Sequence, residues 1–519
     1  MRYNKIMQII SKFWNNFKTQ PDIWFFYGFL ITFTLSIRKV LYFFPIKGEF
    51  NEYAGIYVYL SDIFLIVAIM IWLITILYNK IYILSIDNLK KFYVAAPLLL
   101  VLWAFVSIAW SENYYIALFR SIKILEFYFI YIYIIFRLVK CSTWNIFMKI
   151  IMSVAVFQSI LAIFQFILQH SIGLFWLKES LIGPDILGVA KIIVDGEKII
   201  RSYGLFPHPN ILGGFLLFSI IITILYQKMF HVEHFSKIFN IKCSTPASTQ
   251  GDPSSTRGRW NIIILCLECF ALFLTFSKSA IIGLGLFLLF LCFLNVPRGT
   301  LLIYLKKQFK WLILGFILTL AFLSIVKVNL NSFFIKSLVE RSFYQNVSPV
   351  HFAMQSIASG RGTEIGLLIL GVGNGQFVLG MQDYSKQVLE FWQFQPVHNI
   401  FLLIWSELGA VGLILFLFFI LKILWGKNVP TQKQLNCSTP VEMFHPSRNV
   451  PRGTFYGAGV EHSTGQAWNN LIQVYFKAML LGLIFIMPFD HYLWDIQQGQ
   501  VLLWVVLGLI VVSRLNIDK

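Results

Sequence analysis

Residues 57–78 read YVYLSDIFLIVAIMIWLITILY, an apolar run that holds one charged residue, Asp62. A helix needs about 20 such residues to cross a hydrocarbon layer roughly 30 Å thick, so this stretch predicts a membrane-spanning helix. Similar runs recur along the whole chain, and the sequence therefore predicts an all-α polytopic membrane protein with about twelve transmembrane helices. The predicted spans are Ile23–Phe44, Tyr57–Tyr78, Phe92–Ala109, Tyr114–Phe136, Ile146–Leu168, Pro209–Gln227, Asn261–Phe276, Ser279–Leu294, Trp311–Val326, His398–Leu424, Trp468–Met487 and Gly499–Ser513.

The composition agrees with this interpretation. Hydrophobic residues make up 58% of the 519 residues, and only 13% are charged. Soluble globular proteins carry about 25% charged residues, because their surface must face water. The composition therefore excludes a soluble enzyme.

The formal net charge of +18 predicts an orientation. With the N-terminus inside, more than half of the 42 Lys and Arg residues fall in the segments that face the cytoplasm. Basic residues favour that side of a membrane, so both termini are expected in the cytoplasm. Since orientation explains the excess of basic residues, no nucleic-acid partner is expected.

Five regions follow from these boundaries. Residues 1–22 predict a basic amphipathic cytoplasmic lead-in helix at the membrane surface, with no small-residue site for signal-peptide cleavage. Residues 23–326 contain the first nine spans, with an external loop at 170–208. A large external loop at 327–397 is expected to fold over the outer face. The last three spans follow at 398–513, with a cytoplasmic insertion at 425–467. A cytoplasmic tail at 514–519 ends the chain.

Short motifs recur in or beside the cytoplasmic loops. Lys242–Pro246 is repeated as Asn436–Pro440, and Asn295–Thr300 as Asn449–Thr454. The copies have no fixed period, so they are interpreted as dispersed insertions in exposed backbone, with no role that the sequence identifies. None of the six cysteines falls in an external loop, and the Cys266–Cys269 pair lies in an apolar span, where packing is a better explanation than a metal site.

Charged residues within the spans are costly and usually face the interior of the bundle. Arg120, Lys123 and Glu126 are spaced to share one face of the fourth span. An internal ion-pair network is the preferred interpretation, with a substrate contact second.

The strongest local signal is Arg201-Ser-Tyr-Gly-Leu-Phe-Pro-His-Pro-Asn210, at the outer end of the sixth span. Gly204 allows a turn, Pro209 favours the start of a helix, and Asn210 can cap that start. Arg201 would then be fixed at the membrane surface, where a lipid-linked phosphate lies. The alternative is a turn before a helix with a solvated arginine, and this segment alone favours that alternative slightly.

Further motifs fall on the same predicted face. Lys278 lies in the turn between the seventh and eighth spans, and His398 lies where the tenth span begins. The glycine-rich segment Gly371–Gly375 lacks the Gly-Lys-Ser/Thr ending of a nucleotide-binding loop. A lone histidine is more often structural than catalytic, but His398 lies near external basic residues, and an imidazole titrates near neutral pH.

Taken in order, these residues resemble the O-antigen ligase and O-antigen polymerase superfamily of bacterial envelope enzymes. The landmarks that carry the resemblance are Tyr59–Asp62, Trp110–Asn113, Arg201–Asn210, Phe276–Ala280, Gly371–Phe377, His398-Asn399 with Gly409–Gly412, and Asp490–Gly499. They extend over nearly the whole chain.

The resemblance implies a glycosyltransferase that moves a glycan from undecaprenyl diphosphate to the hydroxyl of a glycan or glycolipid acceptor, on the outer face of the bacterial cytoplasmic (inner) membrane. In the ligases, two external basic residues hold the diphosphate and a histidine assists the acceptor hydroxyl. By motif these are Arg201, Lys278 and His398, where Lys278 stands in place of the more common arginine and lacks its bidentate fork. Arg361, Asn210 and His208 complete the expected substrate-binding residues.

The chemistry fits these residues. A diphosphate leaves readily once its charge is neutralised, and fixed cations can neutralise it as a metal would. The sequence has no Asp-x-Asp motif for a metal-held nucleotide sugar. A metal-independent inverting transfer without a cofactor is therefore expected, with His398 as base or orienting group.

Three alternatives remain open at this point. The first is a repeat-unit polymerase of the same superfamily, which differs from a ligase only in its acceptor. The second is a transporter or flippase, although the two halves of the chain show no internal repeat and the polar clusters gather on one face. The third is a non-catalytic partner protein that binds a lipid-linked glycan.

Overall fold

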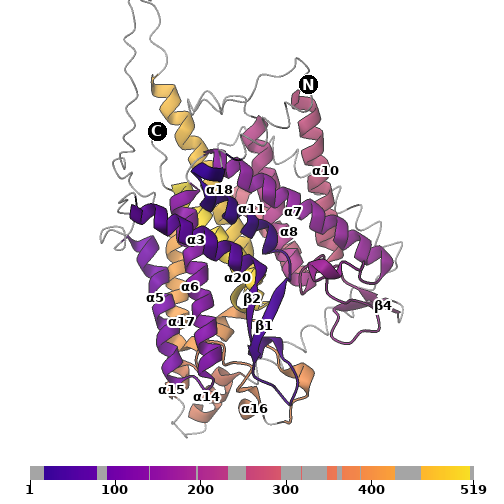
Figure 1. Cartoon of the computed structure of the whole chain (residues 1–519), viewed down its shortest axis with the longest axis vertical. Coiled ribbons are helices and arrows are strands. Elements are labelled where there is room, and N and C mark those ends of the chain that lie inside the picture. Colours follow the sequence, from indigo (N-terminus) through magenta and orange to yellow (C-terminus); the bar gives the residue numbers. More distant parts are fainter. Residues whose placement is uncertain are drawn as a thin grey trace, which may run out of the picture.

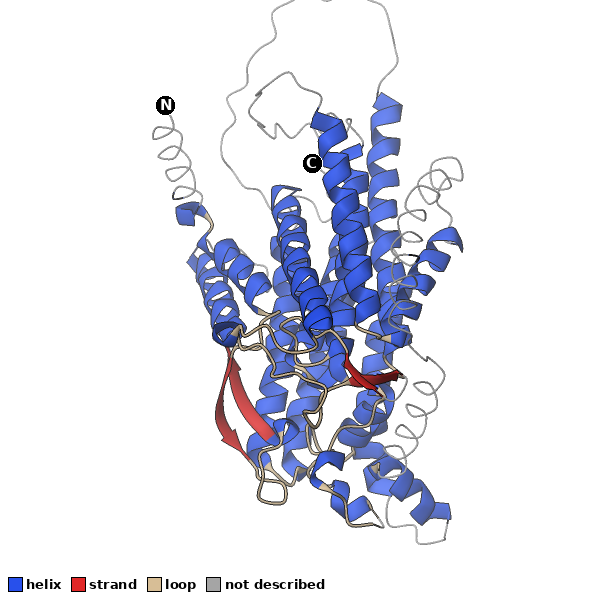
Figure 2. Cartoon of the chain, turned by 90° about the vertical axis from the view of Figure 1, so that its right-hand side faces the viewer, coloured by secondary structure: helices blue, strands red, loops and turns tan. Residues whose placement is uncertain are grey.

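The computed structural model describes residues 14, 17–78, 91–138, 141–194, 197–231, 253–293, 317, 348–358, 365–385, 387–426 and 458–514. Long helices run side by side in a bundle, and two short β-hairpins lie toward one end of it (Figures 1 and 2). The α-helices are α2 (Pro21–Thr32), α3 (Leu60–Tyr78), α5 (Phe92–Val106), α6 (Tyr114–Arg137), α7 (Cys141–Leu168), α8 (Pro209–His231), α10 (Pro253–Leu274), α11 (Lys278–Phe293), α14 (Pro349–Ala358), α15 (Ile365–Leu370), α16 (Met381–Tyr384), α17 (Ile400–Trp425), α18 (Ala458–Ile486), α19 (Tyr492–Asp495) and α20 (Gln497–Arg514). Short 3-10 helices cover Glu52–Ala54, Ser107–Trp110, Phe175–Leu177 and Phe391–Gln393.

Six helical segments within the described residues are long and apolar enough to cross a membrane, as expected of a membrane protein. They are Leu60–Tyr78, Phe92–Trp110, Thr143–Leu168, Pro209–Gln227, Ile400–Trp425 and Gln497–Arg514. Three shorter apolar helices are Trp260–Leu274, Lys278–Leu291 and Leu471–Ile486. The mostly helical membrane architecture is therefore confirmed, but the number of twelve spans is not, and the predicted span Trp311–Val326 falls almost entirely outside the described residues.

The first predicted span, Ile23–Phe44, is wrong in its second half. Helix α2 ends at Thr32, and strand β1 (Arg38–Phe43) pairs antiparallel with β2 (Gly55–Tyr59), Arg38 opposite Tyr59. The second predicted span likewise starts three residues early, because its residues 57–59 belong to β2. Short runs of β-branched and aromatic residues fit a strand as well as a helix, and pairing between the two segments decides in favour of the hairpin.

A second hairpin lies within the loop 170–208. Strands β3 (Lys191–Val194) and β4 (Glu197–Ile200) pair antiparallel directly before Arg201. The carboxylate of Glu179 accepts hydrogen bonds from the backbone amides of Ile172, Gly173 and Leu174, and these bonds hold the first half of the loop in a tight turn. This loop is folded, as the sequence predicts.

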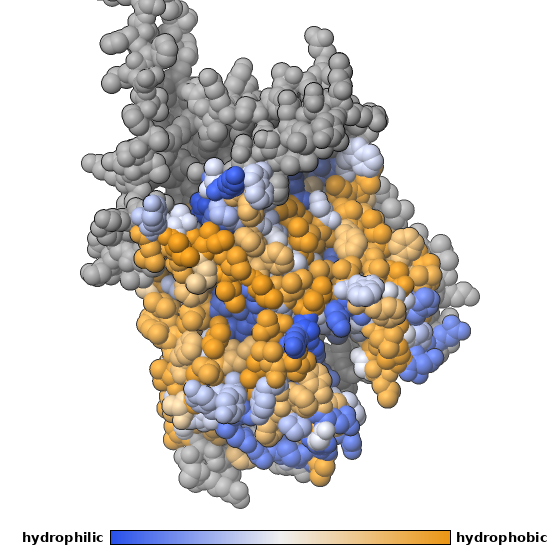
Figure 3. All heavy atoms as spheres, viewed as in Figure 1, coloured by the Kyte–Doolittle hydropathy of each residue, from blue (hydrophilic) through white to orange (hydrophobic). Residues whose placement is uncertain are grey.

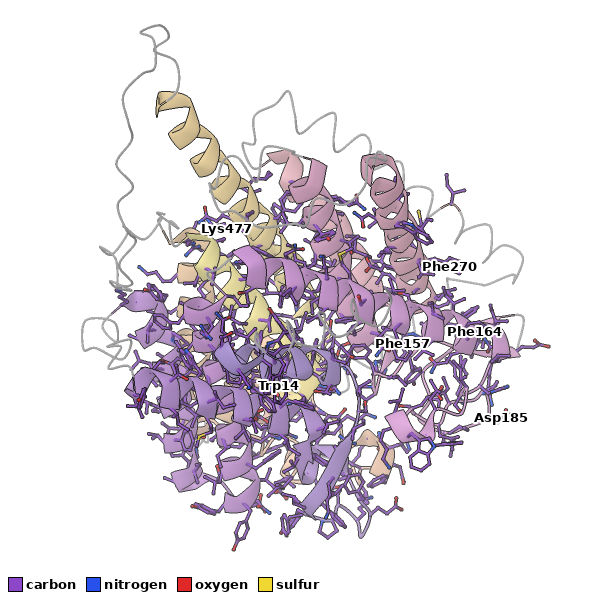
Figure 4. All side chains as sticks on the ribbon, turned by 45° about the horizontal axis from the view of Figure 1, so that its top comes forward. Trp14, Phe157, Phe164, Asp185, Phe270 and Lys477 are labelled. Atoms are coloured by element: carbon purple, nitrogen blue, oxygen red, sulfur yellow. The ribbon has the colours of Figure 1, made fainter. Side chains whose placement is uncertain are left out.

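Helix α7 shows how the bundle divides its residues between lipid and interior. Phe157, Ile160, Phe164 and Ile167 are all at least 40% exposed and recur every three or four residues, so they form one apolar outer stripe. Phe157 and Phe164 are labelled on α7 in Figure 4. By contrast, 89% of the most apolar stretch of α8 and 94% of that of α20 are made up of buried residues. These two helices therefore lie at the centre of the bundle.

The described part of the predicted external loop 327–397 folds back onto α17. The backbone amides of Val372 and Gly373 donate to the carbonyl oxygens of Ser406 and Glu407. At the kink of α17, Gly409 has φ +68°, and a Cβ atom there would collide with the backbone of Ile369. The glycine-rich segment thus packs closely against the kink of α17 and forms hydrogen bonds to it.

A buried ion network joins α3 and α6. The Lys123 ammonium lies 2.7 Å from both Asp62 and Glu126, so the predicted ion pairing is confirmed for Lys123 and Glu126. Arg120 instead donates to two backbone carbonyl oxygens, those of Asp495 at 2.7 Å and Tyr53 at 3.0 Å.

Replacing Lys123 by methionine is expected to destabilise the protein by about 3 kcal/mol, because two carboxylates then remain buried without their cation. The midpoint of thermal unfolding in detergent would measure the loss. The exposed Lys39 of β1, replaced by methionine, is the control and should leave the midpoint nearly unchanged. An unaltered midpoint for Lys123→Met would contradict a stabilising network.

Candidate functional site

The segment from Arg201 to Asn210 is fixed by glutamines of α7. The Gln165 side chain accepts from the amides of Tyr203 and Gly204 and donates to the Gly204 carbonyl, at 2.8–3.1 Å. Gln158 accepts from the amide of Leu205 at 2.8 Å. Gly204 has φ +58°, and its Cα faces Gln158 so closely that a side chain would displace that glutamine. The turn is therefore rigid before it reaches α8.

Helix α8 begins at Pro209, as predicted, but its cap is not the one predicted. The backbone amide of Asn210 donates to Nδ1 of His208 at 3.2 Å, so His208 caps this end. The Asn210 side chain points elsewhere: its oxygen accepts from the guanidinium of Arg201, and its amide nitrogen donates to Asp490 at 2.5 Å. Asn210 is thus a link between two buried charges, which its helix-start position alone did not predict.

Arg201 is 7% exposed and is held from two sides. Besides its bond to Asn210, its Nε donates to the backbone carbonyl of Thr275 at 2.7 Å. Thr275 belongs to the turn between α10 and α11, and Lys278 is the first residue of α11. The fold therefore brings Arg201 to the turn that carries the half-buried Lys278.

His398 lies near Asp490. The backbone amide of Ile400, two residues after His398, donates to the Met487 carbonyl at 2.8 Å, which joins the start of α17 to the turn that contains Asp490 and His491. The rings of His398 and His491 are 5.0 Å apart, centre to centre. The side chains of His398, Asp490 and His491 all place a polar atom within 4.8 Å of one another.

The ring of His491, the third member of the cluster, is held by the carboxylate of Asp495. Asp490 accepts from the backbone amide of His491 at 2.9 Å, and Nδ1 of His491 lies 2.9 Å from Asp495. Asp490 and His491 are 5% and 4% exposed, so both charges interact in a medium of low dielectric constant.

Burial and neighbouring charges set the protonation states. Burial lowers the pKa of Arg201 to about 10, which still leaves the guanidinium charged at neutral pH. Burial, and then the Arg201 charge, lower the pKa of His208 to about 3, so this imidazole stays neutral and suits its capping role. Burial disfavours both charges at Asp490 and His491, but neighbouring histidines lower the pKa of Asp490, and Asp495 raises the pKa of His491.

His398, Asp490 and His491 are the group of described residues that could hold a metal ion. The imidazole and carboxylate donors suit a borderline cation such as Zn²⁺. Nδ1 of His491 is paired with Asp495, which leaves Nε2 for a ligand, and both oxygens of Asp490 accept hydrogen bonds. A carboxylate on the other ring nitrogen is usual for a metal-binding histidine, so these bonds are compatible with a bound cation.

Four of the six predicted site residues are thus brought together, because Arg201, His208 and Asn210 are joined by hydrogen bonds and His398 lies beside Asp490. Lys278 starts the helix three residues after Thr275, whose carbonyl binds Arg201. Arg361 lies outside the described residues. Sequence reasoning did not include Asp490 and His491 among the site residues, although both belong to the last landmark of the resemblance. The pair Asp490-His491 in the last predicted external turn was the available signal.

No family model matches the sequence, and no curated protein matches it either.

Proposed function

We propose that this chain is a membrane glycosyltransferase, which moves a glycan from undecaprenyl diphosphate to the hydroxyl of an acceptor sugar. The single observation that supports this best is the hydrogen-bonded chain Arg201–Asn210–Asp490, with His398 beside its acidic end. In this chain a cation, Arg201, is joined through Asn210 to a carboxylate, Asp490, that lies beside an imidazole. A cation for a leaving diphosphate and a base for an incoming hydroxyl are the two groups that this transfer needs.

The proposed reaction forms one glycosidic bond and breaks the bond between the anomeric carbon and the diphosphate oxygen. The acceptor oxygen attacks the anomeric carbon from the face opposite the diphosphate, so the configuration inverts. The hydroxyl proton passes to His398, while the bonding electrons leave with the diphosphate oxygen. Arg201 and Lys278 neutralise that oxygen, assisted by Arg361 in our proposal, and the Asp490 carboxylate lies beside the imidazolium that forms.

The distribution of basic residues supports placing this site on the outer face of a bacterial inner membrane, with both termini in the cytoplasm. Lipid-linked glycans assembled inside and flipped outward would reach it from the bilayer. The resemblance favours ligation to a glycolipid acceptor such as the lipid A core, and polymerisation of lipid-linked repeat units is the second candidate.

Reconstitution of the purified full-length protein tests the proposal. An undecaprenyl-diphosphate-linked oligosaccharide is supplied with either lipid A core or a second lipid-linked oligosaccharide, and products are identified by mass spectrometry. We expect a new glycosidic bond and release of undecaprenyl diphosphate. Movement of the donor across the vesicle membrane without any new bond would instead identify a flippase, and no turnover of either kind would favour a non-catalytic partner.

Removal of metal ions gives a separate test of the mechanism. With EDTA in the same assay, the rate is expected to stay within about twofold, because Arg201 and Lys278 supply the positive charge that a metal would otherwise supply. A loss of activity that Zn²⁺ or Mn²⁺ restores would contradict this and assign a metal to His398, Asp490 and His491.

A further inference from the structure

Asp490 shares a small cluster with two histidines from different parts of the chain, His398 just before α17 and His491 just before α19. Each of the three side chains places a polar atom within 4.8 Å of the others, and the two imidazole rings are 5.0 Å apart, centre to centre. On a tetrahedral zinc ion each imidazole nitrogen lies about 2.0–2.1 Å from the metal, so two rings that share the ion have their centres about 5 Å apart. The two rings are therefore already at the separation that a shared ion requires.

The carboxylate of Asp490 keeps capacity for a metal. Its two oxygens accept one hydrogen bond each, from the side-chain amide of Asn210 and from the backbone amide of His491. An ionised carboxylate offers about four lone pairs, so each oxygen retains one. The two hydrogen bonds thus fix the direction of the carboxylate without using it up.

The ring of His491 is oriented for the same purpose. Its Nδ1 lies 2.9 Å from the carboxylate of Asp495, which leaves Nε2 for a ligand. A carboxylate that holds the far nitrogen of an imidazole fixes its tautomer and makes the other nitrogen a better donor to a metal. Asp495 is therefore a positioning residue for the site.

The cluster can be reached from water. His398 is half-buried, whereas Asp490 and His491 are 5% and 4% exposed. Tyr53, between strands β1 and β2, makes an edge contact with His491 at 5.7 Å between ring centres, so the cluster lies beside this hairpin. Around the hairpin, hydrophilic residues appear between apolar surfaces in Figure 3. An ion from solution would meet His398 first and the two buried ligands after it.

The surrounding charges select the kind of ion. Asp490 and Asp495 are the carboxylates at the cluster, but Arg201 is joined to Asp490 through Asn210, and Arg120 donates to the backbone carbonyl of Asp495. Two guanidinium groups thus offset much of the negative charge, and attraction by charge alone would be weak. Binding has to come from the bonds to imidazole nitrogen, which favours Zn²⁺ over Mg²⁺, an ion that prefers oxygen ligands.

We propose that His398, Asp490 and His491 bind Zn²⁺, with water as the fourth ligand, and that the bound ion switches off glycan transfer. A neutral imidazole has one basic lone pair, and its other nitrogen carries a hydrogen. Once zinc takes the lone pair of His398, this residue can no longer accept the proton of the acceptor hydroxyl. The zinc site does not depend on the proposed function, whereas the inhibition rests on it.

Calorimetric titration of the metal-free, full-length protein in detergent with ZnCl₂ tests the site. The wild type should bind a Zn²⁺ ion that His491→Asn binds at least about a hundredfold more weakly, because the variant keeps a hydrogen-bonding group near Asp495 but lacks the second ring nitrogen. His170→Ala, on an exposed histidine outside the cluster, is the matched control and should bind as the wild type does. An unchanged Kd in His491→Asn, or a wild type that binds no zinc, overturns the proposal.

Asp490→Asn is the second variant, which decides the matter if His491→Asn does not fold. Its side-chain oxygen can still accept a hydrogen bond, but the negative ligand is lost, so zinc binding should weaken at least about tenfold. The thermal midpoint without metal identifies the folded variants. Added zinc should raise the midpoint of the wild type and of His170→Ala, and not that of a folded His491→Asn or Asp490→Asn.

Inhibition is measured in the transfer assay, starting from metal-free protein. Saturating Zn²⁺ should lower the wild-type rate at least about a hundredfold, the contribution of a general base, and EDTA should restore it. Half of the effect should occur within about threefold of the Kd from calorimetry, since occupancy of one site controls the rate. Mg²⁺ at the same concentrations should leave the rate unchanged, which separates this site from a general effect of divalent ions on the diphosphate.

The outcomes distinguish this proposal from the proposed function. A protein that transfers glycan at an unaltered rate with zinc bound overturns the inhibition, and one that transfers glycan but binds no zinc overturns the site as well. A protein without transferase activity, whose zinc binding is lost in His491→Asn, supports the site and overturns the proposed function alone.

Discussion

Replacing His398 by alanine is expected to lower the rate of glycan transfer about a thousandfold, the usual contribution of a well-placed general base. The hydroxyl of a sugar is a poor nucleophile until its proton is removed. His398 lies beside Asp490, whose pKa is lowered by the surrounding histidines, so the carboxylate stays ionised and can stabilise the imidazolium that forms during the transfer. Initial rates with saturating donor and acceptor measure the effect, which should fall on kcat more than on either KM.

Two variants make the test of His398 specific. His398→Gln retains hydrogen-bonding capacity but cannot take up the proton, so it should be nearly as slow as the alanine variant. His170→Ala removes an exposed histidine outside the cluster and should keep the wild-type rate. Full activity of His398→Ala, in protein with a normal thermal midpoint, would remove His398 from the mechanism.

The sequence predicted where a helix starts when the apolar run begins at a proline or directly after a capping residue. Pro209 starts α8, and Tyr114 starts α6 after the capping side chain of Asn113, which accepts from the amide of Ile116 at 3.2 Å. The hairpin of residues 38–59 was not predicted, because its apolar strand follows α2 without a break in hydropathy and the pairing that defines it is a tertiary property.

The sequence predicted individual residues of the site but not the hydrogen bonds that connect them. Arg201, Asn210 and His398 each lie in a motif that the sequence singles out. The bond between Asn210 and Asp490 joins residues 280 positions apart, so no local pattern could show it. His208, which was predicted to bind substrate, caps a helix, and burial keeps its imidazole neutral by lowering its pKa; the sequence could show neither property.

Arg201→Ala is expected to lower transfer about a thousandfold as well, since a fixed cation at a developing negative charge contributes about two to three powers of ten. Arg201→Lys should recover only part of the rate, because lysine keeps the charge but lacks the fork that reaches Thr275 and Asn210 together. Binding of farnesyl diphosphate, a short analogue of the lipid donor, measures the same interaction without turnover and should be lost in the alanine variant.

Asn210→Ala separates the electrostatic role of Arg201 from its role in the fold. This variant keeps the guanidinium and its bond to Thr275 but breaks the chain to Asp490. If Arg201 neutralises the diphosphate, Asn210→Ala should retain farnesyl diphosphate binding while Arg201→Ala loses it. If Arg201 only holds the turn at Thr275, both variants should bind the diphosphate as the wild type does, and Arg201→Ala should differ in its unfolding temperature alone. The cation that the proposed reaction requires would then have to come from Lys278, whose replacement by alanine should in that case abolish binding.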